Sequence, residues 1–193
     1  MTRIVAGQAR GRKLAVPKSG TRPTSERVRE ALFSHLEHYG YVRGSVVLDL
    51  FAGSGALALE AISRGADRAV AVDMNPTAAK LIRANACAVG FAQQTHVVTK
   101  KADSYLAADV GTLPEFDVAF LDPPYSYSEE ELSRTLELLA PHLPSEALIV
   151  VERAAQSEEP RWPAGFTLCD ERKMGDTRVW SAERALESDS IKA

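Results

Sequence analysis

The chain has 193 residues, of which 45% are hydrophobic and 25% are charged, and its formal net charge is −3. This composition is too apolar for a disordered chain, and the length suits one domain with a full core plus a short appendage. No apolar run approaches the roughly 20 residues that a membrane span needs. The start lacks the apolar stretch of a signal peptide, so we expect a cytoplasmic protein.

Residue types that commonly bind metals form no ligand pattern in this sequence. Cys87 and Cys169 are the only cysteines and lie far apart, and the four histidines are scattered. Structural metal sites usually show closely spaced pairs of such residues. We therefore expect two buried, reduced thiols and no bound metal.

The first 30 residues differ from the rest of the chain in charge. They carry eight basic and two acidic side chains, whereas the remaining residues carry 15 basic and 24 acidic ones. A basic arm on an acidic body indicates a polyanionic partner, with a solvated basic tail as the alternative. The residues expected to contact nucleic acid are Arg3, Arg10, Arg12, Lys13, Lys18 and Arg22.

The arm is predicted to contain a short hairpin. Residues 3–7 and 12–16 have strand character, and residues 8–11 would form the turn between them. Because an isolated two-stranded hairpin is barely stable, residues 1–23 should be a mobile hairpin and linker until they meet RNA or pack on the body. A helix follows, with Thr24 or Ser25 as its cap.

From residue 46 onward the chain alternates between apolar strands and helices. We predict strands at 46–50, 69–72, 96–99, 116–121 and 147–151, with helices at 54–64, 77–89 and 129–140. Two late strands, 166–172 and 177–183, should pair antiparallel because only a short turn separates them. This pattern predicts an α/β domain over 24–184, with a mostly parallel sheet and helices on both faces. Residues 185–193 read as a frayed tail.

A glycine-rich loop follows the first strand of the alternating region and indicates a cofactor site. Glycines there let the backbone approach a ligand at the start of the next helix. The spacing Gly53-x-Gly55 also fits a dinucleotide fingerprint, with Asp73 twenty residues after Gly53. Asp49, however, would repel a pyrophosphate. It suits the ammonium and sulfonium groups of S-adenosylmethionine instead.

Further acidic residues are expected to bind other parts of that cofactor. Asp73 would accept from the ribose hydroxyls, although it could also cap the next helix. Asp103 would accept from the adenine amino group, with a helix cap again as the alternative. The complete set of expected cofactor contacts is Asp49, Phe51, Gly53, Gly55, Asp73, Asn75, Asp103 and Asp122.

A second loop, Asp122-Pro123-Pro124-Tyr125, follows the strand at 116–121 and is the predicted catalytic loop. Two prolines directly after a buried strand make the backbone rigid. Asp122 and the Pro123 carbonyl can accept the hydrogens of an exocyclic base amine and aim its lone pair at a methyl group. Tyr125 can stack on the base, which is worth roughly 1–3 kcal/mol. The base must then be flipped out or single-stranded.

These motifs carry a resemblance to a known family. The segments 49–55 and 122–125 look like motifs I and IV of class I S-adenosylmethionine-dependent amino-methyltransferases. Residues 3–14 and 21–33 resemble the bacterial 16S ribosomal RNA guanine-N2 methyltransferases, the ribosomal small-subunit methyltransferase D family. One departure is Met174, where an aromatic residue is expected before Gly175.

The resemblance implies a Rossmann-like methyltransferase with seven strands, the last one antiparallel, plus an N-terminal β-hairpin. It also implies a target guanine, conventionally numbered 966, in 16S ribosomal RNA of the 30S subunit or a late assembly intermediate. We expect a monomer without membrane contact. The rival interpretations are a DNA adenine-N6 methyltransferase, a protein glutamine methyltransferase, a nicotinamide-dependent oxidoreductase and a non-catalytic RNA-binding assembly factor.

Overall fold

The computed structural model describes residues 2–17 and 25–186. Thr24, Lys18, Arg22 and the predicted boundary near residue 23 lie outside the described residues, as do residues 187–193 of the predicted tail. Within the described part of the chain, no helix is both long and apolar enough to cross a membrane.

The main body is a sheet of seven strands in the order β5-β4-β3-β6-β7-β9-β8. β9 pairs antiparallel with both β7 and β8, and the other neighbours pair parallel. The predicted class I methyltransferase fold, with its last strand antiparallel, is therefore confirmed. The strands are β3 (Val46–Asp49), β4 (Arg68–Asp73), β5 (Thr95–Thr99), β6 (Val118–Leu121), β7 (Leu148–Ala154), β8 (Phe166–Met174) and β9 (Thr177–Arg184).

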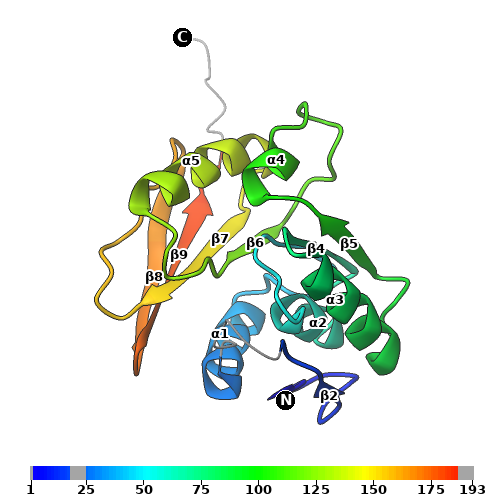
Figure 1. The fold of residues 1–193 in the computed structure, drawn as a ribbon. Helices are drawn as coiled ribbons and strands as arrows, with labels where there is room; N and C mark the ends of the chain where they lie inside the picture. The colour runs from blue at the N-terminus through cyan, green and yellow to red at the C-terminus, as the bar shows by residue number, and fades with distance from the viewer. Residues whose placement is uncertain (1, 18–24, 187–193) are drawn as a thin grey trace.

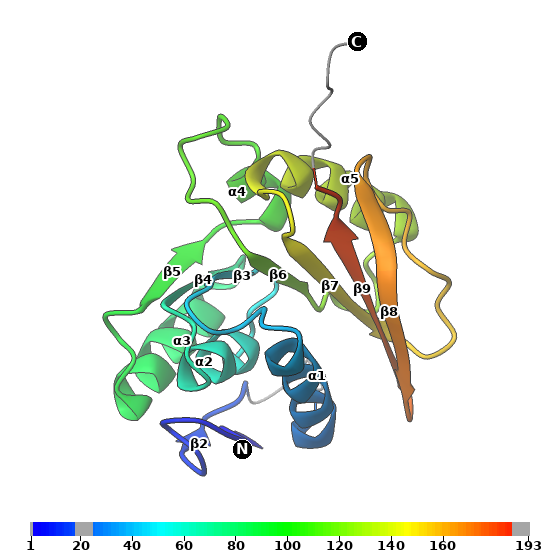
Figure 2. The ribbon, with the colours of Figure 1, turned by 180° about the vertical axis from the view of Figure 1, so that it is seen from behind.

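Helices cover both faces of this sheet (Figures 1 and 2). On one face lie α1 (Glu26–His38), α2 (Ala56–Ser63) and α3 (Pro76–Val89), and on the other lie α4 (Ala102–Leu106) and α5 (Glu129–Leu139) with the 3-10 turn Ala140–His142. Each face closes over its own apolar cluster. α4 is a short helix that the sequence analysis did not predict, because five residues are too few for a periodic pattern.

Side-chain caps explain where the longer helices begin, and of these the cap at Ser25 was predicted from the sequence. The Ser25 hydroxyl accepts from the Val28 N–H at the start of α1, and Asn75 accepts from the Thr77 N–H at the start of α3. Ser128 and Glu131 form a reciprocal capping box at the start of α5. Such caps satisfy backbone N–H groups that the helix itself leaves unpaired.

The N-terminal hairpin differs in extent from the prediction. Its strands are only β1 (Thr2–Arg3) and β2 (Lys13–Leu14). Residues 5–7 leave the pairing because the N–H groups of Val5 and Ala6 donate to the Glu60 carboxylate of α2 instead, at 2.8 and 3.0 Å. In both views the hairpin lies below α2, on the far side from the sheet (Figures 1 and 2).

The expectation of buried thiols is wrong. Cys87 and Cys169 are both exposed and form no disulfide. Cys87 lies on the outer side of α3, whose inner side is packed by the alanines and Ile82, and the Cys169 thiol donates to the Ser181 carbonyl at 3.2 Å. Apolar character alone did not decide which face of each element would carry the thiol.

Candidate active site

A cavity of about 1140 Å³ lies along the carboxyl ends of the parallel strands. This is where open α/β sheets bind ligands, beside the reversal of strand order between β3 and β6. The volume slightly exceeds the usual 300–1,000 Å³ of a small-molecule pocket, so it has room for more than one small ligand. Its walls include most of the predicted cofactor-binding and catalytic residues, namely Asp49, Phe51, Gly53, Asp73, Asn75, Asp103, Asp122, Pro123, Pro124 and Tyr125.

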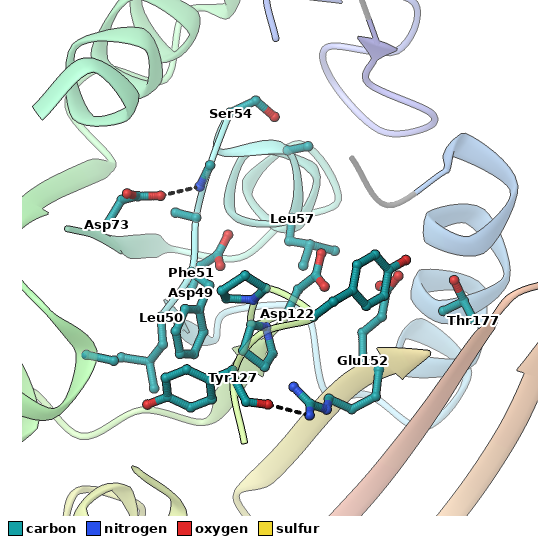
Figure 3. A pocket seen from close by; sticks show the side chains of 18 of the residues that line it. Asp49, Leu50, Phe51, Ser54, Leu57, Asp73, Asp122, Tyr127, Glu152 and Thr177 are labelled. Atoms are coloured by element: carbon teal, nitrogen blue, oxygen red, sulfur yellow. Dashed lines mark hydrogen bonds between the residues drawn. The ribbon is translucent and has the colours of Figure 1, made fainter. Parts of the chain in front are cut away.

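The glycine loop takes its shape from Asp73, which ends β4. One Asp73 oxygen accepts from the Gly53 N–H at 2.9 Å (Figure 3). The other accepts from the Asn75 N–H at 2.8 Å. Gly53 has a φ of 54°, in the region that favours glycine. Asp73 thus fixes the backbone that faces the cavity while its carboxylate stays at the cavity wall.

Gly55 contributes through its backbone conformation. Its φ is 79° at the start of α2, and a Cβ there would lie 3.0 Å from Ile82. It is not among the residues that line the cavity. Asp73 was an alternative candidate for capping the next helix. The cap is instead Asn75, whose Oδ1 accepts from the Thr77 N–H.

Asp49 is a strongly perturbed acid of the site. It is 1% exposed, and neither oxygen has a hydrogen-bonding partner of ordinary geometry among the described residues. Burial, reinforced by the negative charge of Asp122, raises the pKa of Asp49 to about 8, although the N–H groups of Ala58 and Phe51 counter this in part. A buried carboxyl without a partner is well suited to receive a cation from the cavity.

The catalytic loop leaves β6 at Asp122 and is held from two sides. The Tyr127 N–H donates to the Pro124 carbonyl at 2.8 Å, and the Tyr127 ring meets Phe51 edge-on at 5.2 Å. Arg153 of β7 donates to the Tyr127 carbonyl at 2.6 Å, the dashed bond at the base of Figure 3. Tyr125 is 71% exposed beside the cavity, so its ring is available for stacking.

Asp103 lines the cavity and does not cap a helix. It lies in the first turn of α4, whose N-cap is Lys101. Its Oδ1 accepts from the Thr135 hydroxyl at 2.6 Å, and its Oδ2 pairs with Arg134 at 3.3 Å. The helix-cap alternative is therefore wrong, because Thr135 and Arg134 of α5 hold the carboxylate at the edge of the cavity.

The arm is packed against the body by its backbone and apolar side chains. Ile4 and Leu14 are buried, and the Glu60 carboxylate that holds the arm backbone is itself buried beside Arg29 and Arg64. Gly7 sits so close to the end of α2 that a Cβ would lie 1.8 Å from the Ser63 carbonyl oxygen. Over its described residues, 2–17, the arm therefore packs on the body, which is the condition under which order was expected.

Asn85 of α3 links this arm to the cofactor loop. Its side-chain amide accepts from the Ala15 N–H at 2.9 Å and donates to the Ala15 carbonyl at 2.9 Å. The same amide nitrogen donates to the Ser54 carbonyl in the glycine loop at 2.8 Å. One buried side chain therefore connects two segments that sequence analysis treated as separate.

The basic residues of the arm remain on its outer surface. Arg3, Arg10, Arg12 and Lys13 are exposed. Arg3 forms an ion pair with Glu26 at 2.8 Å, and Arg12 donates to the Ala88 carbonyl. Arg29, counted in the basic segment, is instead buried and donates to the Arg3 carbonyl at 2.5 Å.

Further residues that were not among the predicted site residues line the cavity. Glu152 and Arg153 end β7, Thr177 begins β9, and Met174 precedes the turn between β8 and β9. Glu152 and Arg153 could have been found, because charged residues directly after the apolar run 147–151 lie at the ligand-binding edge of the sheet. Thr177 carries no such signal, since β9 is not a parallel strand, and Met174 was singled out only as a departure from the family resemblance.

The residues present fit S-adenosylmethionine better than a dinucleotide. The partnerless Asp49 favours a cationic ligand, and Asp122 and Asp73 add negative charge around it. A pyrophosphate in this place would face all three carboxylates, which is unfavourable at low effective dielectric. The described residues include no group of acidic, histidine and cysteine side chains suited to hold a metal ion.

Known proteins resemble this chain over nearly its whole length. The family described as Conserved hypothetical protein 95 matches residues 2–183. The chain is 39% identical to the ribosomal RNA small subunit methyltransferase D of Escherichia coli K12, covering 97% of this chain and 93% of that protein. It is 37% identical to the protein of the same name from Haemophilus influenzae, covering 90% and 89%.

A solved structure from Escherichia coli, described as a methyltransferase, superimposes with a TM-score of 0.83 at 35% identity and covers 95% of this chain and 98% of that one. The family match therefore spans the arm as well as the sheet. The chain belongs to the ribosomal RNA small subunit methyltransferase D family.

Proposed function

We propose that this protein uses S-adenosylmethionine to methylate the exocyclic N2 amine of a guanine in 16S ribosomal RNA, within the 30S subunit or a late assembly intermediate. The single observation that carries the chemistry is the rigid Asp122-to-Tyr125 loop beside a buried, partnerless Asp49 in one cavity. The ribosomal substrate rests on the names of the relatives, and the guanine rests on the resemblance described above. Such a reaction would take place in the cytoplasm.

Three carboxylates would each contact a different part of the cofactor. Asp49 would face the ammonium of the methionyl part, and Asp73 would accept from the ribose hydroxyls while it holds Gly53. Asp103, tied to α5, would accept from the adenine amine. When bound, S-adenosylmethionine supplies a methyl group that is electrophilic because it is carried by a sulfonium.

The catalytic loop would prepare the amine that attacks. The lone pair of an exocyclic base amine is delocalised into the ring, which makes the amine a weak nucleophile. Asp122 and the Pro123 carbonyl accept its two hydrogens, and this turns the lone pair toward the methyl carbon. When the amine takes the methyl group supplied by the cofactor, Asp122 would receive the displaced amine proton and pass it to solvent.

Two features keep the loop geometry constant. The two prolines limit backbone rotation, and Arg153 anchors the Tyr127 carbonyl below the loop. Arg153 also pairs with Glu129 at the start of α5, at 2.8 Å. Positioned acceptors of this kind contribute most when they need no rearrangement during the reaction.

The exposed basic residues of the arm would bind RNA phosphates next to the cavity. Arg10 and Lys13 lie on the outer surface, and Arg27 and Arg3 line a smaller hollow of about 330 Å³ at the junction with α1. Lys18 and Arg22 belong to the same proposal from their sequence position alone. Contacts of this type set affinity and register rather than base choice.

A side-by-side assay tests the proposed function. Transfer of a tritiated methyl group is measured into naked 16S RNA, 30S particles, duplex DNA and a peptide release factor, and the methylated nucleotide is mapped. We expect label in ribosomal RNA, on N2 of one guanine. Label chiefly in DNA adenine or in release factor would favour the rival enzymes, and binding of RNA without transfer would favour the assembly factor.

A further inference from the structure

The cavity is divided by the order of the strands, and the division determines where a target base can lie. Asp73 and Asp49 end β4 and β3 and belong to the cofactor half. Asp122 follows β6 in the middle. On the opposite side from the cofactor half, β7 and β9 contribute Glu152 and Thr177 (Figure 3). If the proposed function is right, the base enters over β7.

Glu152 lies beside Asp122 at this edge. Leu121 of β6 is paired with Val151 of the parallel strand β7, so Asp122 and Glu152 are each one residue beyond a paired position. Neighbouring strands are about 4.8 Å apart, and paired residues of parallel strands face the same side of a sheet. Both side chains appear at the same end of the cavity in Figure 3.

The face that carries Glu152 can be assigned from its strand neighbours. Val150, two residues earlier, belongs to the apolar cluster under α1 and α2, and so does Val179, the residue of β9 opposite Glu152. Alternation along the strand therefore places Glu152 on that face. Its backbone position is paired with Val179 of β9, which fixes it more firmly than a loop would.

Two adjacent carboxylates suit one base edge in particular. Guanine presents two neighbouring hydrogen-bond donors, the N1–H and the N2 amine, whereas adenine and cytosine present a ring-nitrogen acceptor beside their amine. We propose that Glu152 accepts the guanine N1–H while Asp122 and Pro123 hold the N2 amine. This makes Glu152 a residue that determines base specificity. The Glu152 carboxylate would repel a base that carries a hydrogen-bond acceptor at N1.

A simpler role for Glu152 is to balance charge. Its negative charge is among those that favour the protonated form of buried Arg29, together with Glu60 and Glu26. A residue with only that role would affect folding and would leave base choice unchanged. Base discrimination therefore separates the two roles.

The test uses 2-aminopurine, which keeps the amine on C2 but has an acceptor at N1. Single-turnover methylation is measured on semi-synthetic 16S RNA carrying guanine or 2-aminopurine at the position mapped with the wild type. The wild type should prefer guanine by about 100-fold or more, as expected when a site loses the hydrogen-bond donor that it was built to bind. Because the amide of Glu152→Gln can accept from N1–H or donate to N1, this variant should reduce the preference to within about tenfold.

Three controls complete the experiment. Glu158→Gln, at an exposed position outside the cavity, should keep the wild-type ratio. Glu152→Asp keeps the charge near Arg29 and should retain the preference for guanine even if transfer is slower. Melting temperature and S-adenosylhomocysteine affinity establish that each variant is folded. The missing O6 of 2-aminopurine affects all proteins equally and cancels when their ratios are compared.

Two outcomes overturn the inference. An unchanged ratio in a folded Glu152→Gln variant, or loss of the guanine preference in Glu152→Asp equal to that in Glu152→Gln, would show that the carboxylate does not read N1–H. Each of these contradicts only the role of Glu152, because the wild type still transfers methyl to guanine. Absence of transfer to any guanine-containing RNA by the wild type would contradict the proposed function as well.

Discussion

The buried carboxyl of Asp49 lies close enough to Asp122 for the charge of Asp122 to raise its pKa. Asp49 ends β3 and Asp122 directly follows the neighbouring parallel strand β6, and Asp49 is opposite Phe120, two residues before Asp122. They therefore lie on the same face of the sheet at the cavity. The residue proposed to hold the cofactor cation and the residue proposed to orient the amine are electrostatically linked.

This link predicts that cofactor binding releases a proton. With a pKa of about 8, Asp49 is largely protonated at pH 7 in the free protein, and a bound ammonium would lower that pKa. Calorimetry of S-adenosylhomocysteine binding at pH 7 in buffers of different ionisation enthalpy should show close to one proton released. The release should fade above about pH 9. Asp49→Asn should abolish the proton release. Methylthioadenosine, which lacks the ammonium, should bind without releasing a proton.

The same raised pKa predicts how the stability of the free protein depends on pH. A carboxyl with a higher pKa in the folded state binds its proton more tightly there than in the unfolded chain. Its contribution therefore favours folding least at high pH, and the free energy of unfolding should fall as the pH rises from about 4 to 8. Asp49→Asn should flatten this decline in chemical denaturation, and an equal slope in both proteins would contradict the burial of a titrating Asp49.

Asp122→Ala should keep cofactor binding and lose turnover. Removal of an aligned acceptor should lower single-turnover methylation at least about 100-fold. Because the repulsion of Asp49 also disappears, this variant should release a smaller fraction of a proton on binding S-adenosylhomocysteine. Near-normal methylation by a folded Asp122→Ala protein would remove Asp122 from the mechanism.

Tyr125 variants test stacking. The ring is 71% exposed at the cavity, so Tyr125→Phe should be mild and Tyr125→Ala severe, with a loss of roughly 1–3 kcal/mol. The measurement is single-turnover rate as a function of RNA concentration. Equal losses in both variants would point to the hydroxyl and contradict stacking.

The charge of the arm should affect RNA binding alone. Changing Arg10, Arg12 and Lys13 together to alanine should weaken particle binding and reduce the slope of affinity against salt by roughly 0.7 to 0.9 for each lost phosphate contact. Leu14→Ala is the matched packing variant, since Leu14 is fully buried, and it should lower the melting temperature instead. Full activity of the charge variant at moderate salt would end the docking proposal.

Asn85→Ala should disturb both the arm and the cofactor site, because it removes the side chain that bridges them. It removes the bonds to Ala15 and leaves the Ser54 carbonyl without its partner, a loss of roughly 1–3 kcal/mol for buried groups. We expect weaker S-adenosylhomocysteine binding together with faster proteolysis of the arm. Unchanged affinity with a released arm would show that the glycine loop holds its shape independently.

Local patterns were sufficient for the alternating core and both loops. Apolar runs marked the strands from 46 to 151, because strands buried on both faces are almost continuously apolar. Gly53 and Asp122 were identifiable because each directly follows such a run. Their joint placement at one edge followed from the rule that parallel strands end on the same side.

Contacts between distant segments could not be read in the same way. Whether Val5 pairs in a hairpin or donates to Glu60 depends on where α2 lies. The pattern of hydrophobic residues cannot predict a hydrogen bond to a buried carboxylate 55 residues away. The bridge from Ala15 through Asn85 to Ser54 likewise exists only when three segments meet. The sequence by itself determined the strands, the loops and the chemistry they can carry. Only the tertiary structure decided which carboxylates face one another and what holds the arm, because burial and register arise from packing between elements.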